Sequence, residues 1–103
     1  MNKLIIPGLI LAFAFSMPVS HAGDVSAGGK AFAGKGCNAC HGKTGKEPIA
    51  PNYPVIGGQS ADFLAGELNK FRSGERKEPT MNAMAGMLSD ADIANIAAFL
   101  ATQ

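Results

Sequence analysis

The feature that most constrains this chain is the run Cys37-Asn38-Ala39-Cys40-His41, which contains the only two cysteines among 103 residues. Two thiols three positions apart can each bond to a vinyl group of one haem, and the adjacent imidazole can ligate its iron. C-x-x-C-H is therefore the pattern expected at a c-type haem attachment site. It predicts that Cys37 and Cys40 hold the haem covalently and that His41 is an axial ligand.

Three other uses of the cysteine pair fit the sequence less well. A structural zinc site takes four ligands, and the motif supplies only Cys37, Cys40 and His41. A thioredoxin-like dithiol is expected beside a βαβ pattern, and no strand-like alternation lies nearby. A disulfide across two residues would close a loop too small to stabilise much. Covalent haem attachment is the interpretation that the pattern favours.

The first 22 residues have the form of a secretory signal peptide. Lys3 gives a positive start, residues 4–17 are nearly all apolar, and Ser20 and Ala22 supply the small residues of a cleavage region. The apolar run is too short and too broken by proline for a comfortable membrane span. We expect cleavage after Ala22, leaving one domain, 23–103, in the periplasm without stable membrane insertion. An uncleaved N-terminal anchor is the alternative.

The charge of this domain excludes some classes of function, and its small size limits how much stability its own core can provide. Without Lys3, the nine basic residues become eight, against eight acidic ones. This balance lacks the basic excess that nucleic acid binding needs. A domain this small buries a thin core and usually needs an additional stabilising element. The haem would be that element, so the haem-free protein is expected to be largely unfolded.

Local patterns predict three main helices and an all-α fold. The first is expected over 25–35, with Asp24 as its N-cap. The second is expected over 61–71, with Ser60 as its cap, and its apolar residues recur on one face. The last begins after Ser89, with an acidic residue three positions on that suits a capping box.

Two stretches between these helices are predicted as loops. Residues 42–59 are rich in glycine and proline, and an irregular stretch of this length is usually functional or disordered. We expect it to be ordered against the haem edge. Residues 72–79 carry mixed charges and are predicted to form a solvated surface loop.

The second axial ligand cannot be a histidine of the mature chain, because His41 would be the only one left after cleavage. Methionine is a soft ligand, and Met/His ligation raises the haem potential for electron transfer. Met81, Met84 and Met87 stand together before the last helix. Met81 follows a proline in a segment expected to be extended, whereas Met84 and Met87 suit packing. A lysine amine or an open position are the other possibilities.

The order of these motifs resembles that of small class I c-type cytochromes, of the c553-like or single-domain c4-like type. The resemblance covers essentially the whole mature chain. It is carried by Gly29-Lys30-Ala31-Phe32, Cys37-Asn38-Ala39-Cys40-His41-Gly42, Pro51-Asn52-Tyr53-Pro54-Val55-Ile56-Gly57-Gly58-Gln59, Met81-Asn82-Ala83-Met84-Ala85 and Leu88-Ser89-Asp90-Ala91-Asp92-Ile93.

The resemblance implies the small cytochrome c fold, in which three main helices and long loops surround one covalently bound haem c. The iron-binding methionine of the family stands seven residues before the leucine of Leu-Ser-Asp, which selects Met81 and leaves Met84 as the fallback. The family also implies that the Pro54 carbonyl accepts the second N–H of His41, which would fix the imidazole.

The family further implies that the first and last helices cross closely. The contact here would join Gly29 and Phe32 to Phe99. Relatives often have tyrosine at the position of Phe99, so a hydroxyl is missing from this crossing.

The expected function is the transfer of single electrons between redox proteins of the periplasm. No substrate is transformed, so the chain is not expected to be an enzyme and has no catalytic residues. We expect a monomer whose partners dock at the haem edge through a small transient interface. The alternatives are an electron-entry subunit of a larger redox enzyme, or a haem module whose open sixth site binds small ligands.

Overall fold

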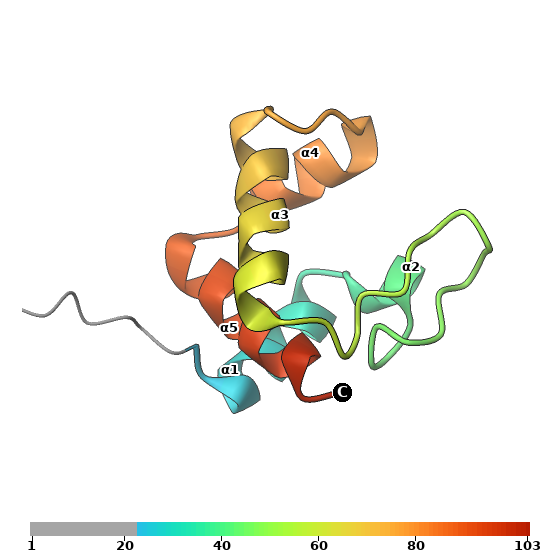
Figure 1. Cartoon of the computed structure of the whole chain (residues 1–103), viewed down its shortest axis with the longest axis vertical. Coiled ribbons are helices and arrows are strands. Elements are labelled where there is room, and N and C mark those ends of the chain that lie inside the picture. The colour runs from blue at the N-terminus through green and yellow to red at the C-terminus, as the bar shows by residue number, and fades with distance from the viewer. Residues whose placement is uncertain (1–22) are drawn as a thin grey trace, which may run out of the picture.

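The computed structural model describes residues 23–103, which form helices and no strands (Figure 1). The predicted all-α class is confirmed. The predicted signal peptide, residues 1–22, lies outside the described residues. In chain order the helices are α1 (Val25–Gly34), α2 (Asn38–His41), α3 (Ala61–Ser73), α4 (Pro79–Gly86) and α5 (Asp90–Ala101).

The three predicted helices are α1, α3 and α5, and each begins at the predicted cap. The side chains of Asp24 and Ser60 accept a backbone N–H in the first turns of α1 and α3. Such a bond satisfies a donor that has no partner within the helix. At α5, Ser89 and Asp92 form a complete capping box. The local cap signals therefore place these helix starts correctly.

The segment around Met81 was predicted to be extended, and this prediction is wrong. Met81 lies in the first turn of α4. Pro79 stands at the start of that helix, where its fixed φ is favourable and its missing N–H is not needed. The carboxylate of Glu78 caps the helix by accepting the N–H of Met81 at 2.6 Å. The proline therefore starts a helix here.

The core lies where α1, α3 and α5 meet. α1 crosses α5, and α3 packs against both α4 and α5. Among the described residues, His41 is the only polar or charged one that is buried. The buried apolar cluster consists of Phe32, Leu64, Leu88, Ile93, Ile96, Ala97 and Leu100.

The crossing of α1 and α5 is close because α1 presents glycines at the contact. A Cβ at Gly28 would collide with the carbonyl of Asn95, and a Cβ at Gly29 would lie 3.1 Å from the Phe99 ring. The rings of Phe32 and Phe99 are 5.6 Å apart between centroids. The predicted contact of Gly29 and Phe32 with Phe99 is therefore present, and Gly28 is an additional part of it.

The predicted surface loop 72–79 is shorter than expected, because α3 continues to Ser73. Two arginines tie this region to its surroundings. Arg72 donates to the Leu88 carbonyl at 3.3 Å and pairs with Asp90. Arg76 pairs with Glu67 at 2.7 Å and stacks over the Phe71 ring. The loop is thus more than a solvated connection.

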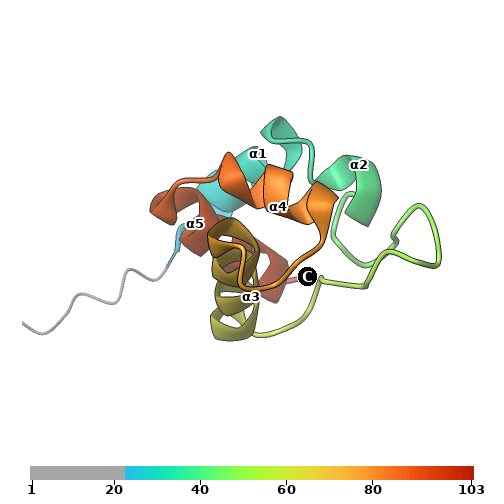
Figure 2. The same cartoon turned by 90° about the horizontal axis from the view of Figure 1, so that it is seen from above.

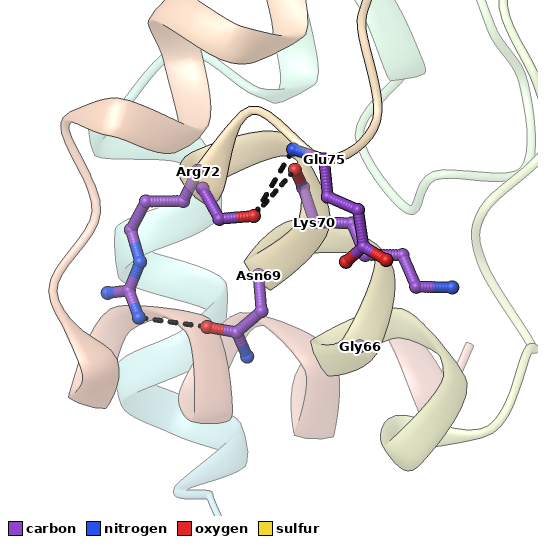
Figure 3. Close-up of a pocket in the computed structure, with 6 residues that line it drawn as sticks. Gly66, Asn69, Lys70, Arg72 and Glu75 are labelled. Carbon is purple, nitrogen blue, oxygen red and sulfur yellow. Dashed lines mark hydrogen bonds between the residues drawn. The ribbon is translucent and has the colours of Figure 1, made fainter.

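A hollow lies on the outer side of α3 near this loop (Figure 3). None of its lining residues belongs to the cysteine motif or to the 42–60 loop, which is the segment that joins α2 to α3. They are Gly66, Asn69, Lys70, Arg72, Ser73 and Glu75.

No helix within residues 23–103 is, taken alone, both long and apolar enough to cross a membrane. α4 and α5 meet that length and composition criterion only as a pair, across a bend of 114°.

Candidate haem site

The cysteine motif forms the single turn α2. Cys37 is its N-cap, with helical φ and ψ of −58° and −38°. The N–H of His41 bonds to the Cys37 carbonyl at 3.1 Å and closes the turn. Residues three apart lie on one side of a helix, so the sulfurs of Cys37 and Cys40 can reach one flat ligand. Both thiols are free and partly exposed.

Gly42 ends this turn and lets the chain fold back on it. Its φ of 83° lies in the region that glycine adopts readily, and a Cβ there would collide with the Glu47 carbonyl. The N–H of Ile49 then bonds to the Cys40 carbonyl at 3.1 Å. The first part of the 42–60 loop therefore folds back against α2. The loop then extends outward beside α2, as Figures 1 and 2 show.

His41 is buried, with 7% of its surface exposed. Its Nδ1 lies 3.4 Å from the carbonyl oxygen of Pro54. Burial lowers the pKa of His41, and the Pro54 carbonyl offsets this only in part. The imidazole is therefore favoured in its neutral form. A ring that donates its Nδ1–H to Pro54 presents the free lone pair of Nε2, which is the form that ligates metals.

Tyr53 is a neighbour of this site to which the sequence interpretation gave no role. Its ring lies edge-on to His41, with 6.1 Å between centroids. The pKa of Tyr53 is raised. The largest cause is the charge of the Cys40 sulfur, and smaller contributions come from a hydrogen bond to that sulfur, from burial and from the charge of Glu78. Tyr53 therefore lies beside the cysteine turn. In the sequence, only its position between Pro51 and Pro54 could have drawn attention to this residue.

Two methionines of α4 lie near this turn. Met81 is near His41. A Cβ at Gly36 would lie 3.9 Å from the methyl carbon of Met84, so Met84 reaches the residue just before Cys37. Met87 is 56% exposed and ends α4. Met81 and Met84 are thus the two thioethers close to the motif.

The state of the thiols bears on the redox-dithiol alternative. Burial is the main factor that raises the pKa of Cys37, and the charge of Cys40 adds to the effect. A reactive dithiol needs a thiol whose pKa is lowered, because the thiolate is the nucleophile. The environment of Cys37 acts in the opposite direction and keeps this sulfur protonated.

The groups around α2 fit a covalently bound haem c. Two free thiols share one side of a turn, and the next residue is a buried neutral imidazole whose Nδ1 faces a carbonyl. A thioether is near that imidazole. These are the donor types of a His/Met c-type haem site. No cluster of three or more His, Cys, Asp or Glu side chains suited to a metal ion occurs in the part of the chain that the structure describes.

Comparison with known proteins decides the family. The sequence model of the family described as Cytochrome c matches residues 25–103. The chain belongs to the cytochrome c family. As a class I c-type cytochrome it has the small cytochrome c fold and carries covalently attached haem c.

Two relatives and one solved structure show how this cytochrome compares in length. It is 44% identical over 85 residues to cytochrome c-554(548) of Halomonas halodenitrificans, covering 80% of this chain and 99% of that protein. It is 38% identical over 103 residues to cytochrome c4 of Pseudomonas aeruginosa, covering all of this chain but 49% of that protein. The crystal structure of reduced cytochrome c4 from Pseudomonas stutzeri matches with a TM-score of 0.72 and 36% identity. That match covers 80% of this chain and 46% of the other, so the chain spans about half the length of these cytochromes c4.

Proposed function

We propose that this cytochrome carries single electrons between redox proteins of the periplasm through one haem whose iron is ligated by His41 and Met81. The observation that carries the proposal is the buried His41 at the end of the cysteine turn, with Met81 near it. Haem c supplies the one-electron chemistry of its iron, and the protein supplies the ligands, their orientation and the surrounding medium.

Each residue of the site has a separate role in this proposal. Cys37 and Cys40 would form the two thioether bonds that hold the haem. His41 ligates through Nε2, and the carbonyl of Pro54 holds its Nδ1, which orients the ring and raises its basicity. Met81 would supply a soft thioether, and a His/Met ligand set raises the reduction potential of the haem.

The surroundings of His41 favour an electron carrier. Its ring is buried beside Cys40 and is met edge-on by Tyr53. A hydrophobic shell limits the access of water and favours the less charged, reduced iron.

Carbon monoxide distinguishes this function from a haem module with an open sixth site. A carrier whose iron is held by Met81 forms no rapid adduct when carbon monoxide is added to the reduced holo-protein. Its oxidised form shows the methionine–iron charge-transfer band. Rapid formation of an adduct, with no such band, would instead support the open-site alternative.

The proposal places the mature protein, residues 23–103, outside the inner membrane as a monomer with one haem. Haem attachment would follow export and removal of residues 1–22. The mass of the exported protein tests this directly: it should equal the chain from Gly23 plus one haem. A mass that retains the first 22 residues would favour an N-terminal anchor. A stable complex with an enzyme on purification would favour the electron-entry subunit.

A further inference from the structure

The first turn of α4, which carries Met81, has little apolar packing of its own. α4 packs against α3, and Ala85, in its second half, is its buried residue. Leu88, just beyond the helix, is also buried. Pro79 and Thr80 are exposed, and Met81 is half-buried. Apolar packing thus holds the end of α4, and something else must fix its start.

The side chain of Asn82 fixes the start of α4. Its Nδ2 donates to the carbonyls of Phe71 and Arg76, both at 2.8 Å. Its Oδ1 accepts the N–H of Glu78 at 2.9 Å. The two carbonyls require the NH₂ group and the N–H requires the oxygen, so the orientation of this amide follows from its partners. One side chain thereby joins the end of α3, the following loop and the N-cap of α4.

Glu78 completes the arrangement around Met81. Its carboxylate accepts the N–H of Met81 at 2.6 Å, and its own carbonyl accepts the N–H of Asn82 at 2.8 Å. The residue after Met81 is thus bonded to α3, and the backbone of Met81 itself is bonded to the N-cap.

We propose that Asn82 is a positioning residue that sets how firmly the sulfur of Met81 is held at the iron. The inference rests on the proposed ligation by Met81. A bound methionine requires its helical turn to stay docked against α3, and Asn82 makes the polar contacts that hold it there. When the docked arrangement is less populated, the arrangement with an open iron is more populated. A competing ligand then binds the iron more tightly, in proportion to the population of that open arrangement.

Imidazole is the probe for this effect. Titration of the oxidised holo-protein with imidazole, followed by loss of the methionine–iron band, gives the apparent affinity of the competitor. Asn82→Ala removes three hydrogen bonds, and losing bonds of this kind is expected to raise that affinity roughly tenfold or more. A guanidinium unfolding curve for each variant reports the change in overall stability separately.

Asn69→Ala is the matched control. Asn69 is also a hydrogen-bonded amide: its Nδ2 donates to the Ala65 carbonyl at 2.9 Å, and its Oδ1 accepts from Arg72 at 2.8 Å (Figure 3). It makes no bond to α4 or its N-cap. Its loss should lower stability without changing the imidazole affinity by more than about twofold.

The outcomes separate this inference from the ligand assignment. Equal imidazole affinity in Asn82→Ala and wild type, with the band lost in Met81→Ala, would overturn the role of Asn82 alone. A band that survives in Met81→Ala would overturn both. If Asn82→Ala yields no holo-protein, Glu78→Ala removes the cap of Met81 at an exposed position. It should raise the affinity in the same direction by a smaller factor, and an unchanged affinity would count against the proposal.

Discussion

Gly28 of α1 lies directly against the main-chain carbonyl of Asn95 in α5, with no space for a Cβ between them. A Cβ at the next residue, Gly29, would lie 3.1 Å from the ring of Phe99, which is a tight contact. Two helices from opposite ends of the domain can therefore approach to backbone contact. This crossing buries Phe32 and fixes the start of the short connection to α2.

Substitution of Gly28 by alanine should destabilise the holo-protein. The added methyl group meets backbone and forces the helices apart, and overpacking of this kind costs about 1–3 kcal/mol. Gly66→Ala is the control, because a Cβ at Gly66, inside α3, meets nothing within 4 Å. Alanine there should raise stability by roughly 0.5–1 kcal/mol. Guanidinium unfolding measures both, and equal effects would contradict the close-contact account.

Folding should depend on the covalent attachment of haem. The buried apolar cluster of the described chain is small and comes mainly from α1, α3 and α5, whereas the long 42–60 loop lies beside α2. A variant with both Cys37→Ser and Cys40→Ser cannot form the thioether bonds. Its far-ultraviolet circular dichroism should show little helix. A full helical spectrum with a cooperative melt would contradict this dependence.

The capping box of α5 should make stability fall in acid. The backbone N–H of Ser89 bonds to the carboxylate of Asp92 at 3.0 Å and lowers its pKa. A carboxyl group with a lowered folded-state pKa stabilises the fold above its ordinary pKa of about 4. This contribution disappears as the pH falls through the lowered value.

Asp92→Asn tests that contribution, because it keeps an acceptor for Ser89 but cannot titrate. Wild type should be the more stable of the two at pH 7, and the difference should shrink toward pH 3. A difference that does not change with pH would contradict the assignment. Ser89→Ala should cost about 1 kcal/mol through loss of the other half of the box.

The parts of the fold predicted correctly are those determined by neighbouring residues. The caps at Asp24, Ser60 and Ser89 lie within three residues of the groups that they satisfy. The start of α4 also has local signals, Pro79 at its first position and Glu78 as its N-cap, and from the sequence that proline was interpreted as a sign of extended chain. The docking of α4 against α3 depends on Asn82, which reaches the carbonyls of Phe71 and Arg76, and the sequence does not indicate these contacts.

The candidate site also has one part that the sequence predicts and another part that it does not. The spacing of Cys37, Cys40 and His41 is a local pattern, and one turn of helix is enough to place it. The position of Tyr53 beside His41 depends on the path of the 42–60 loop. The reach of Met84 toward Gly36 depends on the docking of α4. Sequence spacing carries no information on either contact.

The choice between Met81 and Met84 tests the central claim most directly. The oxidised holo-protein is compared as wild type, Met81→Ala and Met84→Ala, and the methionine–iron charge-transfer band is recorded for each. With Met81 as the ligand, the band is lost in Met81→Ala and kept in Met84→Ala, which loses only a packing contact near Gly36. A band that is lost in Met84→Ala and kept in Met81→Ala would contradict the account.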